Sequence, residues 1–135
     1  MPLLSTRFTP ILPLRNPHFN TVYRPLFMKD VAHYKRHRIT TWDHDFLDLD
    51  FSKIGSTSVV LFIHGLEGSS QSNYMITAAN ACNQNGFDAV CMNLRGCSGE
   101  DNLLLETYHS GKTDDVNFVI NHLNDNYNYE NIVIC

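Results

Sequence analysis

A short, continuous run of β-branched and aromatic residues, Ser58–Ile63, limits what this chain can fold into more than any other feature. A strand that is apolar on both faces must be covered on both, which is typical of a parallel sheet flanked by helices. Similar runs occupy residues 87–94 and 131–135. Because segments with helical periodicity separate the three runs, the sequence predicts an α/β fold built on a βαβαβ parallel sheet.

The two intervening helices have recognisable ends. The first is expected over residues 73–85, where Asn85 and Gly86 supply the left-handed residue that stops it. The second is expected to begin with Thr113 as its cap, with acidic residues in its first turn. Its buried stripe at helical spacing would be Val116, Val119, Ile120 and Leu123.

Proline and glycine divide the chain unevenly. All five prolines lie within the first 25 residues, and all seven glycines lie from Gly55 onward. We therefore expect one incomplete domain over residues 1–135: an irregular arm (1–30), an antiparallel hairpin (31–54) and the βαβαβ core (55–135). The arm should hold one short helix, capped by Asn16 and started by Pro17.

The expected hairpin joins a basic run, residues 33–38, to a run carrying four aspartates. Antiparallel pairing would set opposite charges across from one another, so a solvated hairpin is favoured over a nucleic-acid patch, whose field the acidic strand would cancel. The aspartates could in principle bind calcium, but they lack the glycine and final glutamate of an EF-hand loop. No metal site is therefore predicted for Asp43, Asp45, Asp48 and Asp50.

Charge and composition exclude several classes of protein. The chain has 14 acidic and 10 Lys or Arg residues, a net charge of −4, which argues against a protein that binds duplex nucleic acid. No apolar run is long enough for a transmembrane span, and the first residues lack the apolar core of a signal peptide. Four cysteines without a CxxC pair favour reduced thiols packed as small apolar residues. We therefore expect a cytoplasmic protein without a cofactor.

The segment His64-Gly-Leu-Glu-Gly-Ser-Ser70 follows the first parallel strand and carries most of the chemical information. Its two glycines would allow positive φ angles and bring amide N–H groups to the carboxyl edge of the sheet, where they can hold an oxyanion. A phosphate-binding turn is the alternative, but the segment matches neither of the glycine-rich nucleotide motifs and has no suitably placed lysine.

Several motifs in order resemble one family: Asn16-Pro-His-Phe-Asn-Thr-Val-Tyr-Arg-Pro25, Asp45-Phe-Leu-Asp-Leu-Asp50, His64-Gly-Leu-Glu-Gly-Ser-Ser70, Met92-Asn-Leu-Arg-Gly-Cys-Ser-Gly-Glu100 and Tyr108-His-Ser-Gly-Lys-Thr-Asp-Asp115. Together they look like the YheT-like branch of the α/β-hydrolases, serine hydrolases that act on carboxylic esters, including acyl lipids. The resemblance implies an oxyanion hole built from the backbone of Leu66 and Gly65, with His64, Glu67 and Gly68 supporting the loop. One departure is His44, where the family's turn typically has glycine, so we expect either a turn strained by a positive φ or a turn of another type.

A second departure concerns the nucleophile. The fold needs a G-x-S-x-G elbow, followed later by the acid and histidine of the triad, and the chain contains no such pentapeptide. Ser98, in Gly96-Cys97-Ser98-Gly99, has the wrong spacing and follows the wrong strand, so it is interpreted as a turn former. In the family the elbow would follow the strand that begins at Asn131. We therefore expect a truncated portion of the enzyme, with no triad residue and no activity alone.

Other interpretations of these residues remain. His64 could be a general base, although orienting the loop backbone is favoured, and His109 beside Ser110 is better explained by loop packing than by catalysis. Glu67 could line a pocket or face water. The rival function is a non-catalytic module that self-associates through an open sheet edge at Ile132–Ile134. A third hypothesis is that the chain is a fragment of a longer gene product.

Overall fold

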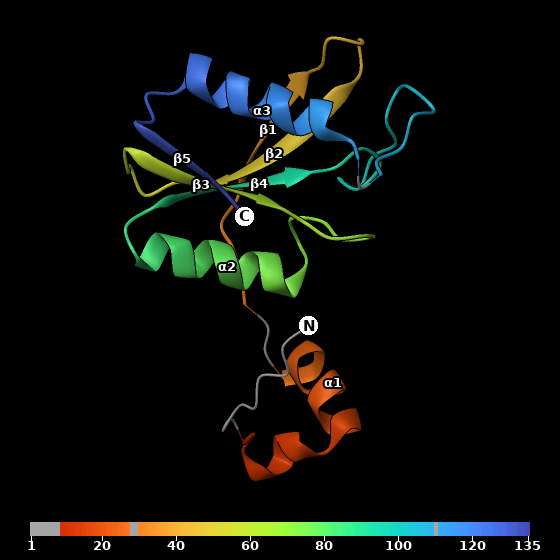
Figure 1. Ribbon diagram of the computed structural model, residues 1–135, viewed down its shortest axis with the longest axis vertical. Coiled ribbons are helices and arrows are strands. Elements are labelled where there is room, and N and C mark those ends of the chain that lie inside the picture. The colour runs from red at the N-terminus through yellow and green to blue at the C-terminus, as the bar shows by residue number, and fades with distance from the viewer. Residues whose placement is uncertain (1–8, 28–29, 110) are drawn as a thin grey trace, which may run out of the picture. The chain divides into compact units, whose positions relative to one another are not determined.

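The computed structural model describes residues 9–27, 30–109 and 111–135 (Figure 1). The chain forms two compact units, Met1–Asp30 and Val31–Cys135. The first contains a short 3-10 helix, η1 (Leu12–Arg15), and helix α1 (Pro17–Phe27). The Asn16 side-chain oxygen accepts the N–H groups of His18 and Phe19 at 3.0 and 3.2 Å, so the predicted cap is confirmed.

The second unit is a five-stranded sheet in the order β1-β2-β4-β3-β5. Its strands are β1 (Lys35–Thr40), β2 (Phe46–Ser52), β3 (Ser58–Ile63), β4 (Asp88–Asn93) and β5 (Asn131–Ile134). Strands β4, β3 and β5 are parallel, whereas β1 and β2 join the sheet antiparallel. Helices α2 (Asn73–Gln84) and α3 (Thr113–Asn126) cover opposite faces of the sheet (Figure 1). The predicted α/β fold is therefore confirmed.

The helix ends show why the local signals worked and where one did not. Gly86, just after α2, has a φ of 85°, the left-handed backbone that ends the helix. Thr113 is the first residue of α3 rather than its cap, and the cap position falls on Lys112, which makes no side-chain cap bond. The prediction of Thr113 as the cap was wrong by one residue. The stripe on α3 is correct, because Val119 and Leu123 are fully buried and the other two positions pack against the same core.

Strand β2 differs most from expectation. Every residue of β2 is buried, because β4 pairs with its second edge, so the prediction of a solvated hairpin was wrong. The charge pairing itself is confirmed: Arg36 lies opposite Asp50 and Arg38 opposite Asp48. Each arginine donates two hydrogen bonds of 2.8 Å to its aspartate, which satisfies the buried carboxylates.

The core lies on both faces of the sheet. One apolar cluster packs β1 to β4 against α3, and the other packs β3 and β4 against α2. Cys82 and Cys91 belong to the second cluster, as expected for small apolar side chains, and all four cysteines are free thiols. Within the described parts of the chain, no helix has the length and apolar character needed to cross a membrane.

Candidate functional site

The loop that follows β3 is fixed at its start by His64. The imidazole is 3% exposed, and its Nε2 accepts the Leu94 N–H at 3.1 Å. The proton therefore sits on Nδ1, which donates to the Gly65 carbonyl oxygen at 2.8 Å. Because both ring nitrogens are occupied, the geometry favours a residue that orients the loop over a general base.

The glycines of this loop serve close packing rather than left-handed backbone. The expectation that Gly65 and Gly68 adopt positive φ was wrong, because the positive φ in this loop, 54°, belongs to Glu67. A Cβ on Gly68 would lie 2.7 Å from the Tyr74 hydroxyl oxygen and 3.0 Å from the Gly65 carbonyl oxygen. Gly68 is therefore required where the turn closes on α2. His44, in contrast, does have a positive φ of 64°, as the sequence suggested.

The amide groups of the loop are almost all occupied. Tyrosine hydroxyls from distant segments accept two of them: Tyr74 accepts the Gly65 N–H at 2.9 Å, and Tyr108 accepts the Glu67 N–H at 2.5 Å. The remaining acceptors for residues 68–71 are Gly65 O, Ser72 Oγ, Asn93 Oδ1 and Ser69 Oγ. Across residues 65–71, the Leu66 N–H is the amide left without an acceptor among the described residues. Sequence reasoning named Leu66 but missed both tyrosines.

Ser70 anchors the far end of the loop to the middle of the sheet. Its hydroxyl donates to Asp50 at 2.5 Å, and Asn93 donates to the same carboxylate at 3.0 Å. Burial opposes ionisation of Asp50, but hydrogen bonds from Arg36, Ser70 and Asn93 outweigh it and hold the pKa of the carboxyl below its usual range. The loop thus ends on a buried charge network that links β1, β2 and β4.

A second buried network lies beside the loop and was not anticipated from the sequence. Arg95, 1% exposed, donates two hydrogen bonds to Asp115 at 2.8 and 2.9 Å and also contacts Asp43 at 2.7 Å and Asp45 at 3.1 Å. Asp45 in turn accepts the Leu103 N–H at 2.9 Å. Asp43 and Asp45, which were expected in a solvated hairpin, therefore fasten the segment between β4 and α3. No local spacing signals this cluster, because its members come together only in the fold.

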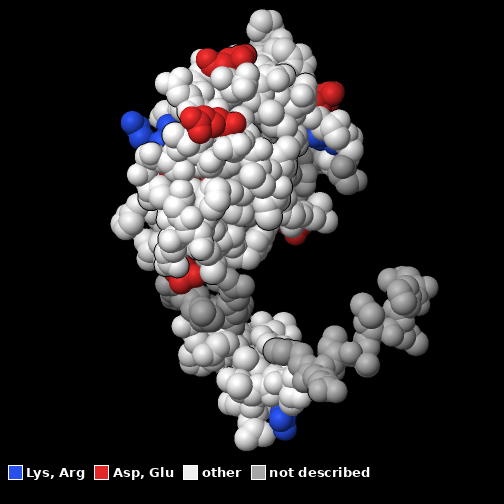
Figure 2. Space-filling model, turned by 60° about the vertical axis from the view of Figure 1, so that its left-hand side comes forward, with Lys and Arg blue, Asp and Glu red and all other residues white. Residues whose placement is uncertain are grey.

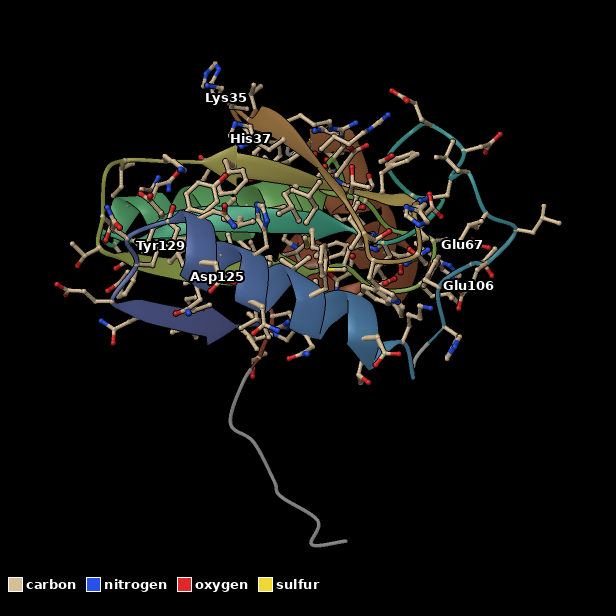
Figure 3. The ribbon with its side chains drawn as sticks, turned by 90° about the horizontal axis from the view of Figure 1, so that it is seen from above. Lys35, His37, Glu67, Glu106, Asp125 and Tyr129 are labelled. Carbon is tan, nitrogen blue, oxygen red and sulfur yellow. The ribbon has the colours of Figure 1, made fainter. Side chains whose placement is uncertain are left out.

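Two hollows flank Tyr108 at this edge of the sheet. One, of about 360 Å³, is mostly apolar and is lined by residues 63–66 together with Leu94 and Val116, among others. The other, of about 510 Å³, is lined by Glu67, Gly68, Cys97 and the Tyr108 ring, among others. Glu67 and Glu106 lie near this end of the molecule (Figure 3). Glu67 is thus both exposed and at the rim of a hollow.

The remaining candidate residues do not form a catalytic pair. The Ser98 carbonyl oxygen accepts from Arg36, and no hydrogen bond joins Ser98 to a histidine among the described residues. His109 Nδ1 accepts the Gly111 N–H at 3.1 Å, which agrees with loop packing, and Ser110 lies outside the described residues. In the same described ranges, no group of three His, Cys, Asp or Glu side chains is arranged to hold a metal ion.

Comparison with known proteins adds a family and several relatives. The model of the family described as alpha/beta hydrolase fold matches residues 58–134. YheT of Escherichia coli (strain K12), whose name places it among esterases, is 35% identical over an alignment of 122 residues that covers 86% of this chain and 36% of YheT. Phospholipase ABHD3 of Homo sapiens is 27% identical over 136 residues, covering 93% of this chain and 33% of that protein. The chain spans about a third of the length of these relatives.

Solved structures agree on the fold. The Pyrococcus furiosus esterase Pf2001 superposes with a TM-score of 0.63 at 21% identity, covering 78% of this chain and 46% of that one. An alpha-beta serine hydrolase homologue from Coxiella burnetii has a TM-score of 0.61 at 18% identity, covering 78% and 52%. At these identities the likeness concerns the arrangement of strands and helices alone.

Proposed function

Because this chain belongs to the α/β-hydrolase fold family, we propose that it forms the oxyanion-loop portion of a serine hydrolase that acts on carboxylic esters. One observation carries the proposal: the Leu66 N–H is the amide in residues 65–71 without an acceptor among the described residues. The neighbouring amides are held by tyrosine hydroxyls, so the loop conformation is fixed before a ligand arrives.

Such an amide suits the chemistry of ester hydrolysis. Attack on an ester carbonyl creates a negatively charged oxygen, and a preorganised N–H donor stabilises it in the transition state by about 3 kcal/mol. The Gly65 N–H is already donated to Tyr74, so Leu66 is the donor and Gly65 contributes its carbonyl to the turn. His64 bonds to the Gly65 carbonyl oxygen through Nδ1 and accepts the Leu94 N–H at Nε2, which ties the start of the loop to the residue after β4.

The nucleophile is not among the residues around this loop. Burial raises the pKa of the Cys97 thiol despite a hydrogen bond with Tyr108, so Cys97 is mostly protonated and a weak nucleophile. The sequence has no G-x-S-x-G motif. We therefore propose that these 135 residues supply none of the triad and do not hydrolyse esters by themselves.

The substrate class follows from the hollow beside Leu66. Its lining is mostly apolar, which suits the acyl part of an ester, and the names of the relatives include an esterase and a phospholipase. A carboxylic ester, including an acyl lipid, is therefore the proposed substrate of the complete enzyme. A cytoplasmic location completes the proposal, supported by four free cysteines.

The test joins residues 1–135 to the part of YheT that follows its matching segment. We expect the fusion to hydrolyse a short-chain chromogenic ester and to react with a fluorophosphonate probe, whereas the 135-residue chain does neither. Labelling or turnover by the chain alone would refute the absence of a nucleophile. A fusion that is folded by circular dichroism, reacts with the probe and yet shows no ester turnover would refute the proposed function.

A second candidate function rests on the edge of the sheet. Strand β5 pairs with β3, and no described strand pairs with its other side. Val133 and Ile134 are 50% and 52% exposed there. An exposed apolar edge favours pairing with a second copy of the chain. Size-exclusion chromatography over a range of concentrations distinguishes the two, because a monomer at high concentration contradicts this alternative.

A further inference from the structure

The basic residues of β1 are divided between the two faces of the sheet. Residues directly opposite in an antiparallel pair share a face, so Arg36 and Arg38 lie on the same face as Asp50 and Asp48. Those arginines are neutralised by carboxylates at 2.8 Å. The alternate positions of β1 face the other way, and the acidic strand does not cancel their charge.

On that other face the partners from β2 are apolar. Lys35 lies opposite Phe51, and His37 lies opposite Leu49. A hollow of about 250 Å³ on this face is lined by His33, Lys35, His37, Phe51 and Lys53. Within the described part of the chain, neither lysine has a carboxylate oxygen within ion-pair distance. Two lysines and two histidines therefore surround a space with no built-in anion.

The ammonium group of Lys53 lies over the faces of two aromatic rings. Its ammonium nitrogen lies 4.1 Å from the centre of the Tyr127 ring and 4.8 Å from that of Phe51. Asp88 attracts Lys53, but one oxygen of Asp88 already accepts three backbone N–H groups and the other accepts the Tyr129 hydroxyl. Burial lowers the pKa of Lys53, and repulsion from Lys35 adds to this effect. A bound anion would offset both the cost of burying the charged Lys53 ammonium group and its repulsion from Lys35.

We propose that the hollow lined by His33, Lys35, His37, Phe51 and Lys53 binds the phosphate group of a phosphomonoester. Lysine ammonium groups are compact point charges with three donors each, and Lys35 at the start of β1 and Lys53 just after the end of β2 can share the oxygens of one dianion. His33 and His37 line the same hollow; Nδ1 of His37 is already hydrogen-bonded to the Tyr127 hydroxyl at 2.9 Å, so Nε2 is the His37 nitrogen left for a ligand. A duplex is a poor alternative, because the net charge is −4 and the charged side chains on the face in Figure 2 are scattered rather than gathered into a basic patch.

The hollow is separate from the candidate active site. Lys35 and His37 lie at one end of the sheet, and Glu67 lies at the other (Figure 3). Phe51 pairs with Val90 near the start of β4, whereas the loop after β3 contacts Leu94 beyond its end. At about 3.3 Å per residue, the two sites are more than about 10 Å apart along the strand. The inference therefore goes beyond the proposed ester hydrolysis and does not depend on it.

The experiment follows backbone amide signals by NMR while inorganic phosphate is added at constant ionic strength. We expect saturable shifts at residues 33–37 and 51–53. K53Q and K35Q should each weaken binding at least tenfold, whereas K53R should keep it within about threefold of the parent chain. R15Q, which removes one positive charge from the other unit, is the matched control and should bind as the parent chain does.

A second arm distinguishes the source of the phosphate. Vesicles of phosphatidylcholine, with or without phosphatidic acid, present the same phosphomonoester on a lipid. Saturable binding of free phosphate alone assigns the site to a soluble ligand, and binding to the phosphatidic acid vesicles that K53Q abolishes assigns it to a headgroup. Absence of both, or equal binding by K53Q, K35Q and the parent chain, overturns the inference.

Discussion

Replacing Gly68 with alanine should disrupt the loop after β3 more than the same change at Gly65. An added Cβ at Gly68 would lie 2.7 Å from the Tyr74 hydroxyl, 3.0 Å from the Gly65 carbonyl oxygen and 3.1 Å from the His64 Cβ. Tyr74 can swing away, but it then gives up the Gly65 N–H. At Gly65 the nearest such atom is 3.9 Å away, an ordinary contact.

The magnitude follows from these contacts. Overpacking a tight site costs about 1–3 kcal/mol, and loss of one hydrogen bond adds about 1 kcal/mol. Alanine at Gly65 meets no such obstacle and restricts the unfolded chain, which is neutral to stabilising by about 0.5 kcal/mol. We therefore expect G68A to be less stable than G65A by about 2–4 kcal/mol.

Urea unfolding followed by circular dichroism measures this difference, since both variants should share one m-value. The amide signal of Leu66 should move in G68A and stay near its original position in G65A. Equal stability of the two variants, or a larger loss for G65A, would show that the loop does not close on Tyr74 in this way.

Three further predictions concern the networks around the loop. R95K should lower the free energy of unfolding by about 3 kcal/mol in urea titrations, because lysine cannot replace the two-pronged contact with buried Asp115; an unchanged midpoint contradicts this. Stability should fall below about pH 4, because Arg95 holds the pKa of Asp43 in the folded protein at about 2, below its value in the unfolded chain. The stability that ionised Asp43 contributes is complete above the unfolded pKa and is lost as the pH falls through the folded pKa. D43N should flatten that acid limb in thermal melts, and an unchanged limb argues against it. Iodoacetamide should modify exposed Cys135 long before buried Cys91, whose thiol pKa burial raises to about 11; peptide mass spectrometry decides, and equal rates contradict the fold.

The elements of the core were predictable because their patterns are local. Strand β3 is apolar on both faces, and α2 is followed by Gly86, whose left-handed backbone stops the helix. Strand β2 was misjudged for the opposite reason. Its alternating aspartates are typical of a solvated strand, and they are buried only because arginines of β1 pair with them while β4 covers the second edge.

The candidate site divides in the same way. Sequence pattern located the loop, because the motif follows directly from the strand before it. Leu66 was named through the resemblance to the α/β-hydrolases, and its role stays a prediction. The tyrosines that occupy the neighbouring amides lie on α2 and in the segment before α3, and Arg95 meets its three aspartates from separate elements. Such partners depend on tertiary packing, and no spacing along the chain encodes them.

The most direct test of the role given to the loop is the turnover of the YheT fusion with proline or alanine in place of Leu66. Proline removes the N–H that has no acceptor among the described residues, whereas alanine removes the side chain and keeps the N–H. We expect L66P to lower kcat by about 100- to 1,000-fold with reactivity toward the fluorophosphonate probe retained, and L66A to stay within about threefold of the parent fusion. Equal kcat values for L66P and L66A in folded proteins would contradict the account, because the amide would then not stabilise the transition state.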